Sequence, residues 1–79
     1  METNGKGKIY DPFGLVYEGE LLYNNRNGKG KEYNKWGGLI YEGEFINNLR
    51  NGKGKDYDDD GKLIFEGKYL NEERLENEK

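Results

Sequence analysis

The sequence predicts an all-β protein: one single-layer, twisted antiparallel sheet, built as a meander of about three β-hairpin repeats. Three observations predict it. The 79-residue chain has 13 Gly and no Ala, so it is poor in helix formers. Short segments alternate apolar or aromatic residues with charged ones, as in strands. Clusters of Asn, Asp and Gly separate these segments at the intervals expected of hairpins.

Two motifs alternate along the chain and define the repeat. Asn-Gly-Lys-Gly-Lys begins at residues 4, 27 and 51. Tyr-Glu-Gly-Glu begins at residues 17 and 41, and the related Phe-Glu-Gly-Lys begins at residue 65. These nearly constant intervals predict one array over residues 4–70, with units of about 5–27, 28–51 and 52–70. A charged tail, 71–79, follows.

Each unit is expected to contribute two strands, giving six in total. Residues 11–14, 34–38 and 58–61 carry the Asp, Asn, Pro and Gly of short hairpin turns. The links at residues 24–27 and 47–51 are rich in Asn and are expected to be longer. In the tail, Asn71 followed by acidic residues favours a helical turn or two.

Alternation along a strand assigns side chains to two faces. Face A is defined by its aromatic residues, leucines and glycines: Leu15, Tyr17, Gly19 and Leu21; Leu39, Tyr41, Gly43 and Phe45; Leu63, Phe65, Gly67 and Tyr69. Face B carries Glu18, Glu20 and their counterparts. With the glycines of the Gly-Lys-Gly strands on face A, a ring can lie over the backbone, and each Lys faces a Glu on face B. Tyr10, Tyr33 and Tyr57 are then expected on face B.

The motif Tyr-Glu-Gly-Glu-Phe, an Asn-rich link and Asn-Gly-Lys-Gly-Lys together resemble the MORN repeat (membrane occupation and recognition nexus) over roughly residues 4–70. The resemblance implies an elongated single-layer sheet with one hairpin per repeat, and adaptor or assembly roles. Two departures stand out. The unit is mostly one residue longer than is common in the family, and Glu32 and Asp56 replace an aromatic residue that many members carry. A β-bulge at these positions would reverse the face of Tyr33 and Tyr57.

Composition argues against most enzyme chemistry. The chain has no His and no Cys, which removes the common general base, the thiol nucleophile and the usual zinc ligands. A net charge of −3 disfavours nucleic acid as a partner. We therefore expect a non-catalytic protein without a cofactor or a metal. No apolar run approaches a membrane span, so the expected location is the cytoplasm, with membrane or cytoskeletal association left open.

Face A suggests the function, because the sequence contains no second layer to cover it. An uncovered apolar face usually marks an interaction site. The predicted occupant is an apolar peptide, an amphipathic helix or a second copy of the chain. Trp36, at a turn apex, is either a partner anchor or a local cover. The predicted partner-binding residues are Tyr17, Tyr41, Phe45, Phe65, Tyr69 and Trp36.

Three alternative functions stay open. Lysines on face B could bind acidic phospholipid, although Glu residues at matching positions oppose this; these lysines are Lys29, Lys31, Lys53 and Lys55. Asp56, Asp58 and Asp60 imitate the first half of a calcium loop, but the sequence lacks its bidentate Glu, so only weak calcium binding is conceivable. Finally, the chain could be the accessory repeat region of a larger enzyme.

Overall fold

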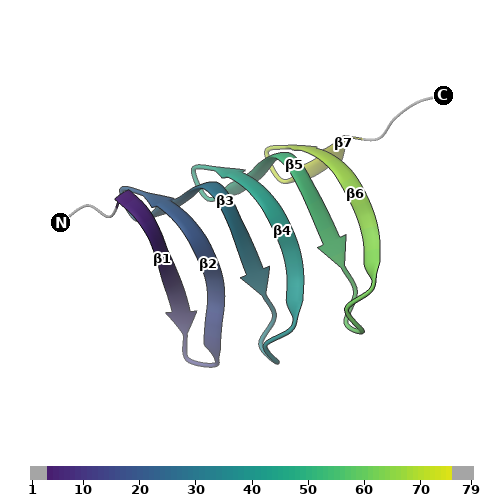
Figure 1. Ribbon diagram of the computed structural model, residues 1–79, viewed down its shortest axis with the longest axis horizontal. Coiled ribbons are helices and arrows are strands. Elements are labelled where there is room, and N and C mark those ends of the chain that lie inside the picture. Colours follow the sequence, from purple (N-terminus) through teal and green to yellow (C-terminus); the bar gives the residue numbers. More distant parts are fainter. Residues whose placement is uncertain (1–3, 76–79) are drawn as a thin grey trace.

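A computed structural model describes residues 4–75 and confirms the predicted fold class (Figure 1). One open antiparallel sheet contains all seven strands of the described residues, each hydrogen-bonded to the next in sequence. The strands are β1 (Asn4–Asp11), β2 (Gly14–Leu22), β3 (Asn25–Tyr33), β4 (Leu39–Ile46), β5 (Leu49–Tyr57), β6 (Leu63–Leu70) and β7 (Glu73–Leu75). The array is elongated, 47 × 25 × 14 Å, with β1 and β7 at opposite ends.

The seventh strand corrects the prediction of six strands and a helical tail. Asn71 and Glu72 form a turn with positive φ values of 49° and 79°. The short strand β7 then pairs with the last three residues of β6, Lys68–Leu70. The reason is periodic: Asn71 occupies the place of Asn47 one repeat later, so residues 71–75 complete the third unit as residues 47–51 complete the second. The sheet thus continues past residue 70, and the rest of the predicted tail, 76–79, lies outside the described residues.

The Asn-rich links are shorter than predicted. Each is a turn of only two residues, both with positive φ, as in the type I′ turns that suit twisted hairpins. The values are 51° and 66° at Tyr23 and Asn24, and 49° and 73° at Asn47 and Asn48. As a result, the arginines after these turns, Arg26 and Arg50, belong to strands β3 and β5.

The other three turns lie together along the opposite edge of the array (Figure 1). Their first residues close them through side-chain hydrogen bonds, as the Asp and Asn starts predict. Asp11 Oδ1 accepts the N–H of Phe13 at 2.8 Å. Asn34 Oδ1 accepts the N–H of Trp36 at 3.0 Å, and Asp58 Oδ1 accepts that of Asp60 at 2.9 Å. We call this side, with residues 10–14, 33–39 and 57–64, the turn edge.

Register places one glycine of each strand from β1 to β6 in a single row across the sheet. The paired residues are Gly7 with Gly19, Gly19 with Gly30, Gly30 with Gly43, Gly43 with Gly54, and Gly54 with Gly67. A Cβ added at Gly30 would lie 2.5 Å from Tyr17 Cε1, and one at Gly54 would lie 2.5 Å from Tyr41 Cε1. The prediction that these glycines make room for rings is confirmed.

Face B also follows the predicted register, with lysines opposite glutamates. Lys8 pairs with Glu18, Lys31 with both Glu18 and Glu42, and Lys55 with both Glu42 and Glu66. One pair departs from this pattern, because Lys53 faces Lys68.

β-Bulges lie between Glu32 and Tyr33 and between Asp56 and Tyr57. They do not reverse the faces of the tyrosines. The hydroxyl of Tyr33 donates to Glu18 Oε1 at 3.2 Å, and that of Tyr57 donates to Glu42 Oε1 at 3.3 Å. Both tyrosines therefore lie on face B, as predicted.

Face A is the hydrophobic core, not an uncovered groove. Tyr17 and Tyr41 have no exposed surface, and Phe45, Tyr69 and Leu21 expose 1%, 3% and 8%. The rings form a row of edge-to-face contacts, with centroids 5.3 Å apart for Tyr17–Phe45, 5.2 Å for Phe45–Tyr41, 5.3 Å for Tyr41–Tyr69 and 5.5 Å for Tyr69–Phe65. Large rings lying flat on glycines cover one another, so no second layer is needed. The expectation of an open aromatic face is wrong for these buried residues.

Candidate interaction surfaces

Three arginines, one from each successive repeat, line the core on face A. Each guanidinium lies over the ring nine positions earlier: Arg26 over Tyr17 at 5.0 Å, Arg50 over Tyr41 at 4.4 Å, and Arg74 over Phe65 at 4.6 Å. These are cation–π distances. This row was not predicted from the sequence. Arginine recurs at the repeat interval, and this recurrence could have revealed it.

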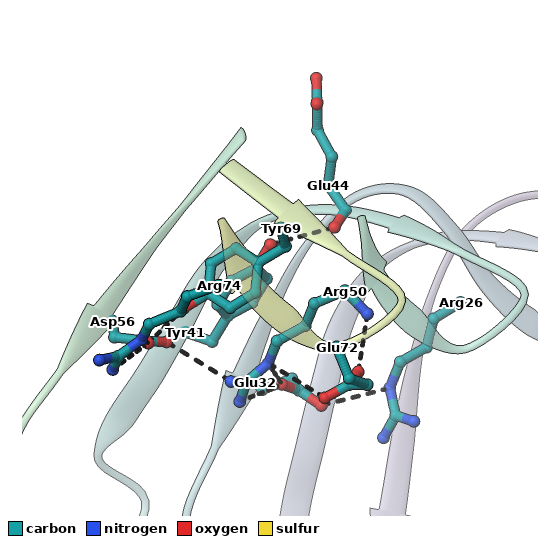
Figure 2. A network of polar contacts seen from close by, with 9 residues as sticks. All are labelled: Arg26, Glu32, Tyr41, Glu44, Arg50, Asp56, Tyr69, Glu72 and Arg74. Carbon is teal, nitrogen blue, oxygen red and sulfur yellow. Dashed lines mark hydrogen bonds and ion pairs between the residues drawn. The ribbon is translucent and has the colours of Figure 1, made fainter. Parts of the chain in front are cut away.

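The two acidic residues that depart from the family pattern join these arginines into a ladder (Figure 2). Arg50 Nη2 lies 2.9 Å from Glu32 Oε1, and Arg50 Nη1 lies 3.5 Å from Asp56 Oδ1. Arg74 Nη2 lies 2.6 Å from Asp56 Oδ2, which also accepts the hydroxyl of Tyr69. Glu32 and Asp56 thus face the core, where each carboxylate neutralises arginines from successive units.

Burial and charge shift the pKa values of the residues in this layer. Burial alone would lower the pKa of Arg50, but the neighbouring Glu32, with Asp56, raises it overall. Burial raises the pKa of Tyr17 to about 12. Burial also raises the pKa of Tyr41, and burial with the hydrogen bond to Asp56 raises that of Tyr69. Arg50 therefore stays charged, and Tyr17, Tyr41 and Tyr69 stay protonated, near neutral pH.

The tyrosine shifts predict alkaline unfolding. An unfolded tyrosine loses its proton near pH 10, whereas folded Tyr17 keeps it until about pH 12. Between these values the unfolded chain binds fewer protons, so the free energy of unfolding falls as the pH rises through this window. We expect circular dichroism to report unfolding there, together with a late rise in tyrosinate absorbance. A fold unchanged past the point where all tyrosines have ionised would contradict this burial.

The three most exposed aromatic residues of the described chain, Tyr10, Phe13 and Trp36, lie at the turn edge, whereas Tyr23, 57% exposed, lies in the β2–β3 turn at the opposite edge. Trp36 is 76% exposed, so the interpretation of Trp36 as a local cover is wrong. Lys35 Nζ lies 5.0 Å from the centre of its ring. Phe13, in the turn of the first hairpin, is 72% exposed and was not predicted as a site residue. It holds the same place in its unit as Trp36 does in the next, and this equivalence is the signal that could have found it.

Of the six predicted partner-binding residues, the structure brings five together on face A and separates one. Tyr17, Tyr41, Phe45 and Tyr69 are buried, and Phe65 is half-buried at the end of the ring row near β7. Trp36 lies apart from them at the turn edge. Surface available to a partner is therefore found on Trp36 and on part of Phe65.

Face B carries a shallow groove of about 630 Å³ between rows of lysines and glutamates. The predicted lipid-binding lysines are all exposed on this face: Lys29, Lys31, Lys53 and Lys55. Four lysines and four glutamates line the groove, so their charges cancel. The groove offers alternating charges rather than a basic surface.

The acidic residues of the calcium alternative are not brought together. Asp56 is 6% exposed and contacts Arg50 and Arg74 on face A, whereas Asp58 Oδ1 accepts backbone N–H groups inside its own turn. Among residues 4–75 no group of three side chains could hold a metal ion. In that same part of the chain, no helix is long and apolar enough to cross a membrane.

Comparison with known proteins agrees with the repeat geometry. The model of the MORN repeat matches residues 17–39 and 41–62, which together make up more than half of the chain. No curated protein matches the chain. Each matched segment contains a face A ring, the glycine over which that ring lies, and the arginine whose guanidinium covers the ring. The chain belongs to the MORN repeat family.

Proposed function

We propose that this protein is a non-catalytic interaction module that contacts a protein partner through its turn edge, with Trp36 and Phe13 as anchors. MORN repeats are generally interaction or membrane-associated modules. The observation that carries the proposal is the exposure of these two large aromatic side chains, 76% and 72%, at equivalent places in successive units. Exposed aromatic residues of this kind commonly anchor interfaces.

Geometry supports treating the two anchors as one surface. Their turns are separated by two strands of the sheet, which corresponds to about 10 Å. Further apolar side chains on the same edge are exposed, among them Tyr10 at 63%, Leu63 at 50% and Ile64 at 56%. The side-chain hydrogen bonds of Asp11 and Asn34 hold both turns in shape, which lowers the entropy cost of binding.

Face A has a supporting role in this proposal. The packed rings of Tyr17, Tyr41 and Phe45 fix the spacing of the hairpins, and the hairpins present the turns. Of the predicted face A residues, half-buried Phe65 is the one with surface to offer a partner. The absence of His and Cys supports the non-catalytic role. That the chain serves a larger enzyme as an accessory region stays a prediction.

The test compares proteins captured by matched variants. Immobilised wild-type chain and the Phe13→Ala/Trp36→Ala double variant are incubated with the same cell extract, and retained proteins are quantified by mass spectrometry. Ile46→Ala is the control, because Ile46 is also apolar and 52% exposed but lies at the opposite edge. We expect the double variant to lose the captured partner and the control to retain it, since anchor residues commonly contribute about 2 kcal/mol or more.

The fluorescence of Trp36, the only tryptophan, gives a second measurement. Emission should shift to shorter wavelength when the purified partner covers the ring. Equal capture of a partner by all three chains, without a shift, would contradict the turn edge as the contact.

Acidic phospholipid is the second candidate partner, because the four exposed lysines share face B. The opposing glutamates predict only weak, salt-sensitive attraction. We expect little sedimentation with phosphatidylcholine vesicles containing phosphatidylserine at low salt, and none at high salt. Strong sedimentation that Lys29→Glu/Lys31→Glu abolishes would make lipid binding the main function instead.

A further inference from the structure

We infer that a second surface of this chain binds an acidic amphipathic helix of a protein partner. The surface lies on face B along the edge of the two-residue turns, opposite the turn edge (Figure 1). Its apolar part, which we call the aliphatic row, consists of Leu22, Ile46, Leu49 and Leu70. Because the row lies at the other ends of the strands from Trp36, the inference does not depend on the function proposed for the turn edge.

The side chains of the aliphatic row are exposed although each is large and apolar. Leu22, Ile46 and Leu70 end strands β2, β4 and β6, and they are 39%, 52% and 53% exposed. Each directly follows a buried residue of face A, so alternation places it on face B. Leu49, 40% exposed, pairs with Ile46 at the start of β5. A contiguous set of exposed apolar side chains of this kind usually marks an interaction site.

Hydrogen bonds between neighbouring hairpins fix the position of the row. The N–H of Asn48 donates to Arg26 O at 2.9 Å, and Asn48 Oδ1 accepts the N–H of Arg26 at 2.8 Å. One repeat later, the N–H of Glu72 donates to Arg50 O at 2.9 Å, and Glu72 Oε2 accepts the N–H of Arg50 at 2.7 Å. Each of these turns is thus bound to the strand beside it. The row is preorganised, which lowers the entropy cost of binding.

The spacing of the row suits an α-helix that crosses the strands. Neighbouring strands place their side chains at intervals of about 4.8 Å along the row. Helix residues alternately three and four positions apart share one face and rise by about 5 Å at each step. A residue of such an apolar stripe therefore meets each strand from β2 to β6, a distance of about 19 Å or about 13 helical residues. On β3 the row is interrupted by Asn25, which pairs with Leu22.

The charges next to the aliphatic row determine the charge of the helix. The neighbouring row of face B contains four exposed lysines and two glutamates: Lys6, Lys29, Lys53 and Lys68, with Glu20 and Glu44. Both glutamates accept backbone N–H groups, those of Lys29 and Lys53. Lys53 faces Lys68, and like charges opposite one another destabilise a sheet. A partner carboxylate between these two ammonium groups removes the repulsion, so the matching helix carries acidic residues beside its apolar stripe.

An acidic membrane matches this surface less well than a helix does. A membrane would also contact the next row of face B, in which glutamates alternate with lysines: Glu18, Glu42 and Glu66 with Lys8, Lys31 and Lys55. A helix is about 10 Å across, so it covers only the aliphatic row and the lysine-rich row beside it.

The probe for the test is a synthetic peptide of about 15 residues. It carries leucines alternately three and four positions apart, with glutamates on both sides of this stripe. A helix this short is marginal alone in water, so circular dichroism detects helix formation on binding. Fluorescence anisotropy of the labelled peptide, titrated with the full chain, measures affinity. We expect the peptide to bind, to become helical and to bind more weakly as salt is raised.

Ile46→Glu tests the aliphatic row at its centre. The matched control is Ile64→Glu, which makes the same change at an apolar residue of face B that is 56% exposed but lies at the turn edge. We expect Ile46→Glu to weaken peptide binding about tenfold or more, and Ile64→Glu to weaken it less than about twofold. Circular dichroism checks that both keep the fold. A partner anchored by Trp36 keeps its contact in Ile46→Glu, so this inference and the turn-edge proposal can fail separately.

Lys68→Glu tests the charge beside the row and leaves the aliphatic side chains in place. It should weaken binding of the acidic peptide several-fold and strengthen binding of a second peptide with lysine in place of each glutamate.

Three results would overturn the inference. One is that the acidic peptide does not bind at its highest soluble concentration, or binds Ile46→Glu as tightly as wild type. Another is equal binding of a peptide with a central proline, which breaks the helix and would indicate an extended partner. The third is sedimentation of the chain with phosphatidylserine vesicles that Ile46→Glu abolishes, without peptide binding, which would make a membrane the occupant of the row.

Discussion

Replacing Gly43 with valine is expected to abolish the cooperative fold. A Cβ at this position would lie 2.5 Å from both Gly54 Cα and Lys53 O, which are backbone atoms of the neighbouring strand and cannot move aside independently. Tyr41 Oη would lie 2.6 Å away. The strands would have to separate in the middle of the array, so we expect a loss of at least about 3 kcal/mol in the free energy of unfolding, measured by urea denaturation.

Gly61→Asn is the control for this change. Gly61 has a positive φ, 83°, and a Cβ there meets no atom within 4 Å. Asn tolerates the left-handed region, so the cost should stay below about 1 kcal/mol. If Gly61→Asn destabilised the chain more than Gly43→Val, the placement of the glycine row beneath the rings would be wrong.

Phe45→Ala is expected to have the second large effect, a loss of about 3–5 kcal/mol. Phe45 is 1% exposed, and its ring lies between those of Tyr17 and Tyr41. Its removal would leave a cavity at the centre of the ring row and unfold much of the population in a chain this small. Thermal denaturation followed by circular dichroism measures the change.

Trp36→Ala is the matched comparison, since it removes a larger ring from a site that is 76% exposed. The expected change in stability is within about 0.5 kcal/mol. Together the two variants separate a ring that holds the fold from a ring that is free to bind. Similar losses of stability in both would show that exposure at the turn edge has been misjudged.

Much of the architecture could be predicted from local chemistry. Repeated Gly-Lys-Gly and Tyr-Glu-Gly segments fix the faces, because a shift of one residue would move lysines among the rings. The pairings of Lys31 with Glu42 and of Gly43 with Gly54 confirm this reasoning. The turn starts at Asp11, Asn34 and Asp58 were also predictable from residue type.

Burial of face A could not be predicted in the same way, because it depends on contacts between different units. Tyr17 is covered by Phe45 and by the guanidinium of Arg26, which belong to later strands. The sequence contains no second layer that could cover face A. The rings of face A are covered instead by neighbouring side chains of the same sheet. The twist of the two-residue turns brings these side chains together.

The arginine ladder was missed for a related reason. Arg26 and Arg50 were assigned to loops, because the Asn-rich links were expected to be longer than two residues. Once these residues belong to strands, their side chains lie on face A with Glu32 and Asp56. Strand β7, whose residue Arg74 repeats the position of Arg50, was missed for another reason, because Asn71 and the acidic residues after it favour a helical turn.

Hydroxyl-radical footprinting of the native chain tests most directly the central claim that face A is a self-covered core and that the exposed rings lie elsewhere. Mass spectrometry measures the oxidation rate of each ring, and rings of the same chain serve as mutual controls. Tyr10, Phe13 and Trp36, which are 63%, 72% and 76% exposed, should be oxidised rapidly, whereas Tyr41 and Phe45 should be protected until the chain unfolds. Oxidation of Tyr41 and Phe45 in the folded chain as fast as that of the turn-edge rings would show that face A is open, and would contradict the account.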